Sequence, residues 1–164
     1  MWNSLIENGA TPVGLGARDT LRLEKGYLLS GQDFLWPGLG ISPEIDIPEG
    51  FLSRNSTETN VPFGLNLEHE FIGKDFVVKS IDYNVKWRGL VCQEKGPKPR
   101  PGHAVFDGPE ESANKLGYVT SGGPSPSLNN TGIAMGYLEG VSLGQEVWIQ
   151  ASSRRRAVSY THLT

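Results

Sequence analysis

The second half of the chain alternates short apolar runs with turn signals, and this rhythm limits the folds that it can adopt. Segments rich in glycine and proline, such as 96–102, separate the runs. The runs themselves recur over residues 85–92, 104–106, 116–120, 133–138 and 147–150. Short strands joined by frequent turns are typical of an all-β sandwich or barrel. We therefore expect a small β domain from about residue 79 onward, with Trp87 and Trp148 in its core.

A charged segment bounded by glycines, Gly14–Gly26, is the most distinctive part of the first half. Gly26 suits the left-handed position that follows a helix, because glycine has no Cβ to oppose a positive φ. Leu21 and Leu23 alternate with polar residues, as they would in a half-buried strand. The pattern alone therefore leaves both a helix and a strand open for this segment.

The opening residues and a later loop complete the first half. Trp2, Leu5 and Ile6 would share one face of a short helix, which Gly9 would end. Residues 35–60 contain many Pro, Gly and polar residues and predict a long loop. We assign no ligand to this loop.

Composition excludes several classes of function. The net charge of −3 argues against a nucleic-acid partner. The lone Cys92 permits neither an internal disulfide framework nor a cysteine-based zinc cluster, and three scattered histidines predict no metal site. His69 lies between two acidic residues and is expected on the surface. The Gly122–Ser127 segment lacks the lysine of a phosphate-binding loop. Apolar runs are too short to span a membrane, so we expect a cytoplasmic protein.

Three motifs carry a resemblance to a known family. They are Gly14–Gly26, Glu70–Asp75, and Val119–Leu128 followed by Gly132–Tyr137. Together they resemble the signatures of the glycine-cleavage aminomethyltransferases, the T-protein family, in the family's order and at about its spacing. The resemblance covers about residues 1–156.

The resemblance implies a mixed α+β fold that is cut at its start. Residues 1–78 would be the C-terminal remnant of a folate-binding aminomethyltransferase domain, and residues 79–156 a small C-terminal β-barrel. Met1 would be an internal residue or an accidental start, because in the family the helix at residues 2–6 is internal and most of the folate pocket precedes it. Residues 157–164 depart from the family's usual ending, so we expect a non-native tail there.

The resemblance also implies an activity. Members transfer an aminomethyl group from the lipoyl carrier protein (H-protein) to tetrahydrofolate and release ammonia. Arg18 occupies the motif position that binds the folate, and a guanidinium offers a planar, permanently charged set of donors for it. Asp19 and Arg22 are expected to hold the turn. The family's catalytic aspartate would lie in a part that precedes this sequence, so we expect the chain to contain no catalytic residue and to be inactive alone.

Other interpretations remain open at this point. A folate-dependent demethylase, or the folate module of a dimethylglycine or sarcosine dehydrogenase, shares the same scaffold. A non-catalytic folate-binding protein of the iron–sulfur repair type would carry a cysteine motif after Lys25–Gly26, and here Tyr27 and its neighbours contain none. A free-standing β-barrel interaction domain would require residues 79–156 to fold alone.

Overall fold

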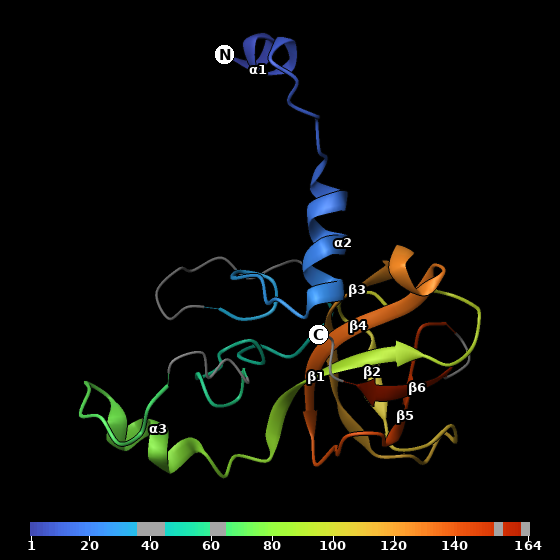
Figure 1. The fold of residues 1–164 in the computed structure, drawn as a ribbon. Coiled ribbons are helices and arrows are strands. Elements are labelled where there is room, and N and C mark those ends of the chain that lie inside the picture. Colours follow the sequence, from blue (N-terminus) through green and yellow to red (C-terminus); the bar gives the residue numbers. More distant parts are fainter. Residues whose placement is uncertain (36–44, 60–64, 153–155, 162–164) are drawn as a thin grey trace.

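The computed structural model describes residues 1–35, 45–59, 65–152 and 156–161. Figure 1 shows the strands gathered into one body, on which one helix stands, while two further helices lie away from it. In chain order the elements are α1 (Trp2–Glu7), α2 (Leu15–Lys25), α3 (Lys74–Ser80), β1 (Val85–Cys92), β2 (Ala104–Phe106), β3 (Lys115–Ser125), the 3-10 turn η1 (Pro126–Leu128), β4 (Thr131–Glu139), β5 (Glu146–Ile149) and β6 (Arg156–Thr161).

The strands form a closed barrel in the order β1-β4-β3-β2-β5-β6. All of its pairings are antiparallel, and β6 closes it by pairing with both β5 and β1. Closure gives every strand a neighbour on both sides, although the short β2 pairs with only part of β3. The predicted β domain is confirmed, and the apolar runs at 85–92 and 104–106 coincide with β1 and β2.

Two expectations for the barrel need correction. The turn predicted after residue 120 begins later, because β3 continues to Ser125. Gly122 lies within this extension, where a Cβ would come within 2.7 Å of the Pro99 carbonyl oxygen, so glycine serves close packing there. Residues 157–161 do not form a tail beyond the barrel but belong to its closing strand β6. That they are foreign to the natural protein stays a prediction, and residues 162–164 lie outside the described part.

Two apolar clusters form the core. The first fills the barrel, with inward-facing residues from all six strands, among them Leu90, Val105 and Val119. The second lies between the barrel and the first half of the chain and joins Leu23 to residues of β1 and β4, including Trp87. Trp87 is thus a core residue as expected, whereas Trp148 is only half-buried.

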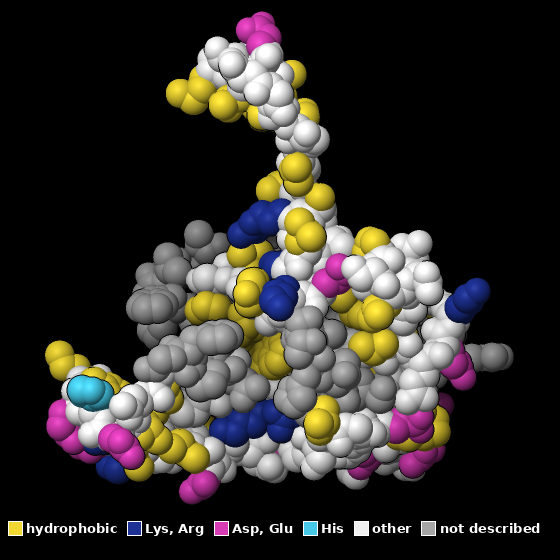
Figure 2. Space-filling model, viewed as in Figure 1, with side chains coloured by type: hydrophobic (Ala, Val, Ile, Leu, Met, Phe, Trp, Pro, Cys, Tyr) yellow, Lys and Arg dark blue, Asp and Glu magenta, His cyan; other side chains and the backbone are white. Residues whose placement is uncertain are grey.

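The first half contributes helices with little buried surface. The Gly14–Gly26 segment, open between helix and strand, is the helix α2, and Gly26 ends it in the left-handed conformation with φ 73°. The predicted opening helix is confirmed as α1, which has no buried residue. Figure 2 shows its hydrophobic side chains on the surface. No helix among the described residues is long and apolar enough to cross a membrane.

Part of the predicted 35–60 loop lies outside the described residues, which resume at Ile45. From there to residue 59 the chain forms turns and bends, apart from an isolated bridge between Ser53 and Leu35. Leu52 is almost fully buried, so this stretch packs on the rest of the molecule. His69 is exposed, as predicted.

Candidate functional site: the junction of α2 with the barrel

The helix α2 meets the barrel through its C-terminal half. Within α2, all of which is described, Arg22 and Leu23 are the buried residues. Leu23 is 2% exposed and packs in the cluster that contains Trp87 and Tyr137. Arg22, the residue before Leu23, carries a charge into the same interface. Burying a charge costs free energy of folding unless the charge is paired.

The Arg22 guanidinium offsets that cost through hydrogen bonds to three side chains. Its Nε donates to Asp19 one turn earlier, at 2.6 Å. Its Nη1 donates to the Asp33 carboxylate at 2.6 Å, and its Nη2 donates to the Ser121 hydroxyl of β3 at 2.8 Å. The guanidinium therefore joins α2 both to the turn that follows it and to the barrel.

Asp33 is the acceptor at the centre of this arrangement and is fully buried. Besides Arg22, it accepts hydrogen bonds from the hydroxyls of Thr120 at 2.5 Å and Ser121 at 2.6 Å. The backbone N–H of Leu29 donates to it at 2.8 Å. With four donors around one carboxylate, the charge is well compensated, as a buried ion pair requires.

A second carboxylate fastens the end of α2 to η1. Glu24 accepts hydrogen bonds from the Ser125 hydroxyl at 2.6 Å, the Ser127 backbone N–H at 2.9 Å and the Ser127 hydroxyl at 2.8 Å. These bonds, first among them the one from Ser125, lower the pKa of Glu24 below its ordinary value. The serines of the Gly122–Ser127 segment therefore act as structural donors to a helix.

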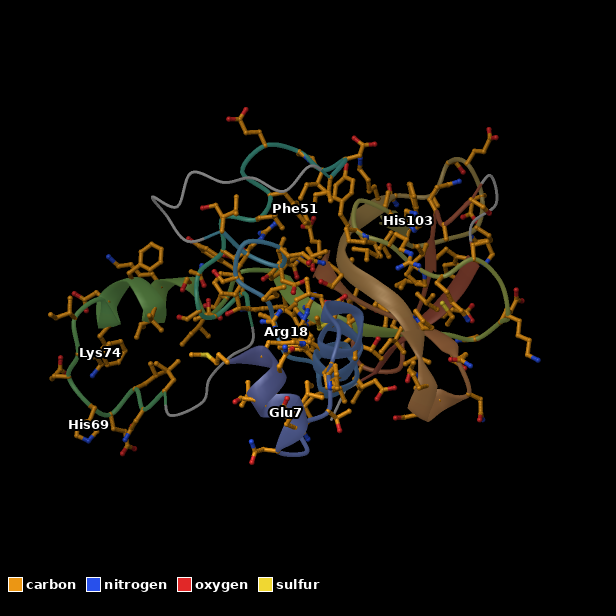
Figure 3. The ribbon with its side chains drawn as sticks, turned by 90° about the horizontal axis from the view of Figure 1, so that it is seen from above. Glu7, Arg18, Phe51, His69, Lys74 and His103 are labelled. Carbon is orange, nitrogen blue, oxygen red and sulfur yellow. The ribbon has the colours of Figure 1, made fainter. Side chains whose placement is uncertain are left out.

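Arg18 lies one turn before Arg22 on α2 and is exposed. Asp19, its neighbour, bonds to Arg22 instead. Among the described residues, no hydrogen bond or ion pair is made by the Arg18 side chain. Figure 3 shows Arg18 on α2, well separated from His69 and Lys74. Asp19 and Arg22, which the sequence predicts to hold the turn, bond to each other within α2. That Arg18 binds a ligand stays a prediction.

A group of aromatic and charged residues adjoins the same junction, because Tyr137 shares a cluster with Leu23 and Phe51 packs against that cluster. The Arg54 guanidinium lies 4.6 Å from the ring centre of Phe51 and 4.8 Å from that of Tyr137, and it pairs with Glu58 at 2.7 Å. Burial raises the pKa of Tyr137. The Tyr137 hydroxyl, the Trp87 Nε1 and the Arg54 Nε are buried without a hydrogen-bond partner among the described residues. Sequence reasoning did not find this group.

An open pocket of about 580 Å³ lies elsewhere on the barrel, lined by Asp46, Ile47, Pro48, Gly102, His103, Ala104, Lys115, Tyr118 and Gln150. Burial, and then the charge of Arg100, lower the pKa of His103. Lys115 donates to the Tyr118 hydroxyl at 2.6 Å. No cluster of His, Cys, Asp and Glu that could hold a metal ion occurs in the described part of the chain.

Comparisons with known proteins point to one family. Residues 86–163 match the model of the glycine cleavage T-protein C-terminal barrel domain. A probable aminomethyltransferase of Halobacterium salinarum is 37% identical over 139 residues, which are 85% of this chain and 33% of that protein. The aminomethyltransferase of Staphylococcus saprophyticus is 34% identical over 162 residues, which are 94% of this chain and 39% of that protein.

A solved structure agrees with these relatives. The crystal structure of glycine cleavage system aminomethyltransferase T from Bartonella henselae matches with a TM-score of 0.70 and 27% identity, over 97% of this chain and 40% of that one. The chain spans 33% to 39% of the length of the two curated relatives named above. It belongs to the glycine cleavage T-protein family and contains the C-terminal barrel domain of that family.

Proposed function

We propose that the chain is the C-terminal part of a tetrahydrofolate-dependent aminomethyltransferase of the glycine cleavage system. Such an enzyme takes the aminomethyl group from the lipoyl carrier protein, releases ammonia and passes the one-carbon unit to tetrahydrofolate. The observation that carries the proposal is an exposed Arg18, unpaired among the described residues, in the first half of a helix that a buried network holds on the barrel. That the protein is located in the cytoplasm stays a prediction.

The surroundings of Arg18 support this proposed role. A guanidinium is planar and permanently charged, and it can donate to the acceptor edge of a pterin or to a carboxylate of the glutamyl tail. The neighbouring Asp19 carboxylate does not compete for it, because Asp19 bonds to Arg22. When bound, the folate supplies the nitrogens that accept the one-carbon unit. The contribution of this chain is to bind and orient that molecule.

The proposed enzyme needs a further part, which would carry the catalytic carboxylate and cover exposed apolar surface. The side chains of Trp2 on α1 and Phe76 on α3 are 63% and 57% exposed, and Leu5 is 51% exposed. Apolar surface of this kind marks interaction sites. We infer that it packs against residues corresponding to the share of the relatives that this chain does not span. The lipoyl carrier protein would dock on the assembled enzyme.

Two measurements on the purified chain test the proposal. We expect no transfer of an aminomethyl group, because the proposed carboxylate that assists proton movement would belong to the share of the relatives that this chain does not span; turnover would refute this. We also expect the chain to bind 5-formyltetrahydrofolate, a stable reduced folate, in a calorimetric titration. Losing a charge-assisted hydrogen bond costs about 1.5–3 kcal/mol. R18A should therefore bind roughly 10- to 100-fold more weakly.

The matched control is K25A. Lys25 is an exposed cation at the other end of the same helix, so its removal changes the charge equally without touching the proposed contact. K25A should bind the folate like the unaltered chain. Equal losses in R18A and K25A would show a general effect of charge and would remove the reason for assigning Arg18 to the folate.

A further inference from the structure

We propose that the buried ion pair between Arg22 and Asp33 is a positioning device for Arg18. It fixes the direction in which α2 leaves the barrel and thereby the place of the Arg18 guanidinium. The inference rests on the proposed function of Arg18 as a folate contact. Neither Arg22 nor Asp33 would touch the ligand; both would act through the helix.

The helix depends on few contacts for its direction. Residues 15–18 of α2 are all exposed, and the buried residues Arg22 and Leu23 lie in its second half. The contact of Leu23 with the barrel is apolar, and apolar burial is not directional. Glu24 tethers the last turn to η1 and leaves the first turns untouched. A second contact of defined geometry, closer to the helix start than Glu24, is therefore needed to fix the direction of the helix.

The Arg22 contacts have that geometry. Arg22 bonds to Asp33 and to Ser121, and Ser121 itself bonds to Asp33 at 2.6 Å, so the three side chains form a closed triangle. Its corners come from α2, from the turn after α2, and from β3. A rotation or tilt of the helix would break at least one side of the triangle inside a buried site, where an unmade bond is expensive.

The distance along the helix turns a small tilt into a relevant displacement. Arg18 precedes Leu23 by five residues, and at 1.5 Å per residue a tilt of about 10° around Leu23 moves its backbone by about 1 Å. Binding groups must be held within about 0.5 Å of their productive position. Loss of the triangle would therefore misplace Arg18 even though the barrel stays folded.

Lysine is the informative replacement at position 22. R22K keeps the positive charge opposite Asp33 but offers a single ammonium in place of the planar group that reaches two partners at once. The control is K25Q, which alters an exposed cation of the same helix outside the triangle.

Two readouts test the proposal on the purified chain. The first is the orientation of α2 relative to the barrel, measured from residual dipolar couplings of backbone amides. We expect reduced couplings in α2 of R22K, unchanged couplings in the barrel strands, and no change in K25Q. The second is the affinity for 5-formyltetrahydrofolate. R22K should bind the folate roughly 10-fold more weakly than the unaltered chain. Combined with R18A it should cause no further loss of affinity, because both changes remove the same contact between Arg18 and the folate.

The outcomes separate this inference from the proposed function. Unchanged α2 couplings in R22K would overturn the positioning role. Additive losses of folate affinity in the R18A/R22K double variant would overturn it too, because a purely structural role of Arg22 gives additive losses. A third outcome combines reduced α2 couplings in R22K with a chain that binds no folate, or with an R18A variant that binds folate normally. This outcome supports the positioning of α2 and overturns the folate contact of Arg18.

Discussion

Replacing Asp33 by alanine is the most informative single test of the junction between α2 and the barrel. The change removes an acceptor that is fully buried and receives four hydrogen bonds, from Arg22, Leu29, Thr120 and Ser121. The Arg22 charge would stay buried with Asp19, itself partly exposed, as its remaining acidic partner. Breaking a buried pair from one side costs about 3–5 kcal/mol, because it leaves a charge without compensation.

Unfolding by urea, followed by tryptophan fluorescence, measures that cost. With a slope of about 2 kcal/mol per molar urea, a loss of about 4 kcal/mol lowers the midpoint by about 2 M. Trp87, one of four tryptophans, lies in the cluster against which Leu23 packs, so part of the emission reports on the same junction. If D33A is too unstable to purify, D33N, which keeps the shape and loses the charge, should show the same direction of effect.

A double variant separates loss of the pair from loss of compensation. R22M/D33L replaces both charges with apolar groups and should cost less than D33A alone, because no buried charge remains unpaired. The reasoning is refuted if D33A loses less than about 1 kcal/mol, the range of an exposed ion pair. It is also refuted if D33A lowers the free energy of unfolding by the same amount in the R22M variant as in the unaltered chain.

Three further predictions concern other parts of the molecule. E24Q should be less stable than the unaltered chain at neutral pH, because folding lowers the pKa of Glu24; this difference should disappear in urea titrations as the pH falls through the lowered pKa. G136A should lose about 3 kcal/mol in the same assay, since its Cβ would lie 2.3 Å from the Tyr118 carbonyl oxygen, whereas G16A, with open space around its Cβ, should gain about 0.5–1 kcal/mol. The ring of His103 should titrate in NMR spectra with a midpoint below 6.5, the ordinary value, because burial disfavours its charged form; a midpoint above 6.5 would contradict this environment.

The strands of the barrel were largely predictable because their signal is local. Apolar runs between turn residues gave the bounds of β1 and β2. The end of β3 was missed because Gly122 and Pro124 are read as turn residues. In the structure Pro124 of β3 pairs with Gly132 of β4 on one side. On its opposite side β3 extends beyond the end of β2, so no β2 residue requires the N–H that proline lacks.

The sequence predicted one residue of the candidate site, and the role of that residue stays a prediction. The sequence indicated Arg18 through a motif, and the structure shows its side chain exposed and unpaired among the described residues. It could not indicate the partners of Arg22, because Ser121 lies 99 residues away and reaches Arg22 only through the packing of α2 on β3. The alternation of Leu21 and Leu23 resembled a strand, yet Leu21 is 65% exposed and Leu23 is buried, which is the outcome of a helix lying on one face.

The way α2 is held explains why a costly polar network lies at this junction. A helix of 11 residues is marginal by itself in water, so its stability must come from packing. Burying Leu23 contributes about 1.5–3 kcal/mol, enough to keep the helix on the barrel but without a preferred tilt. The pair of Arg22 and Asp33 adds little net stability once its desolvation is counted. What it adds is direction: a chain with apolar residues at both positions could match the natural chain in stability and still lose the fixed place of Arg18.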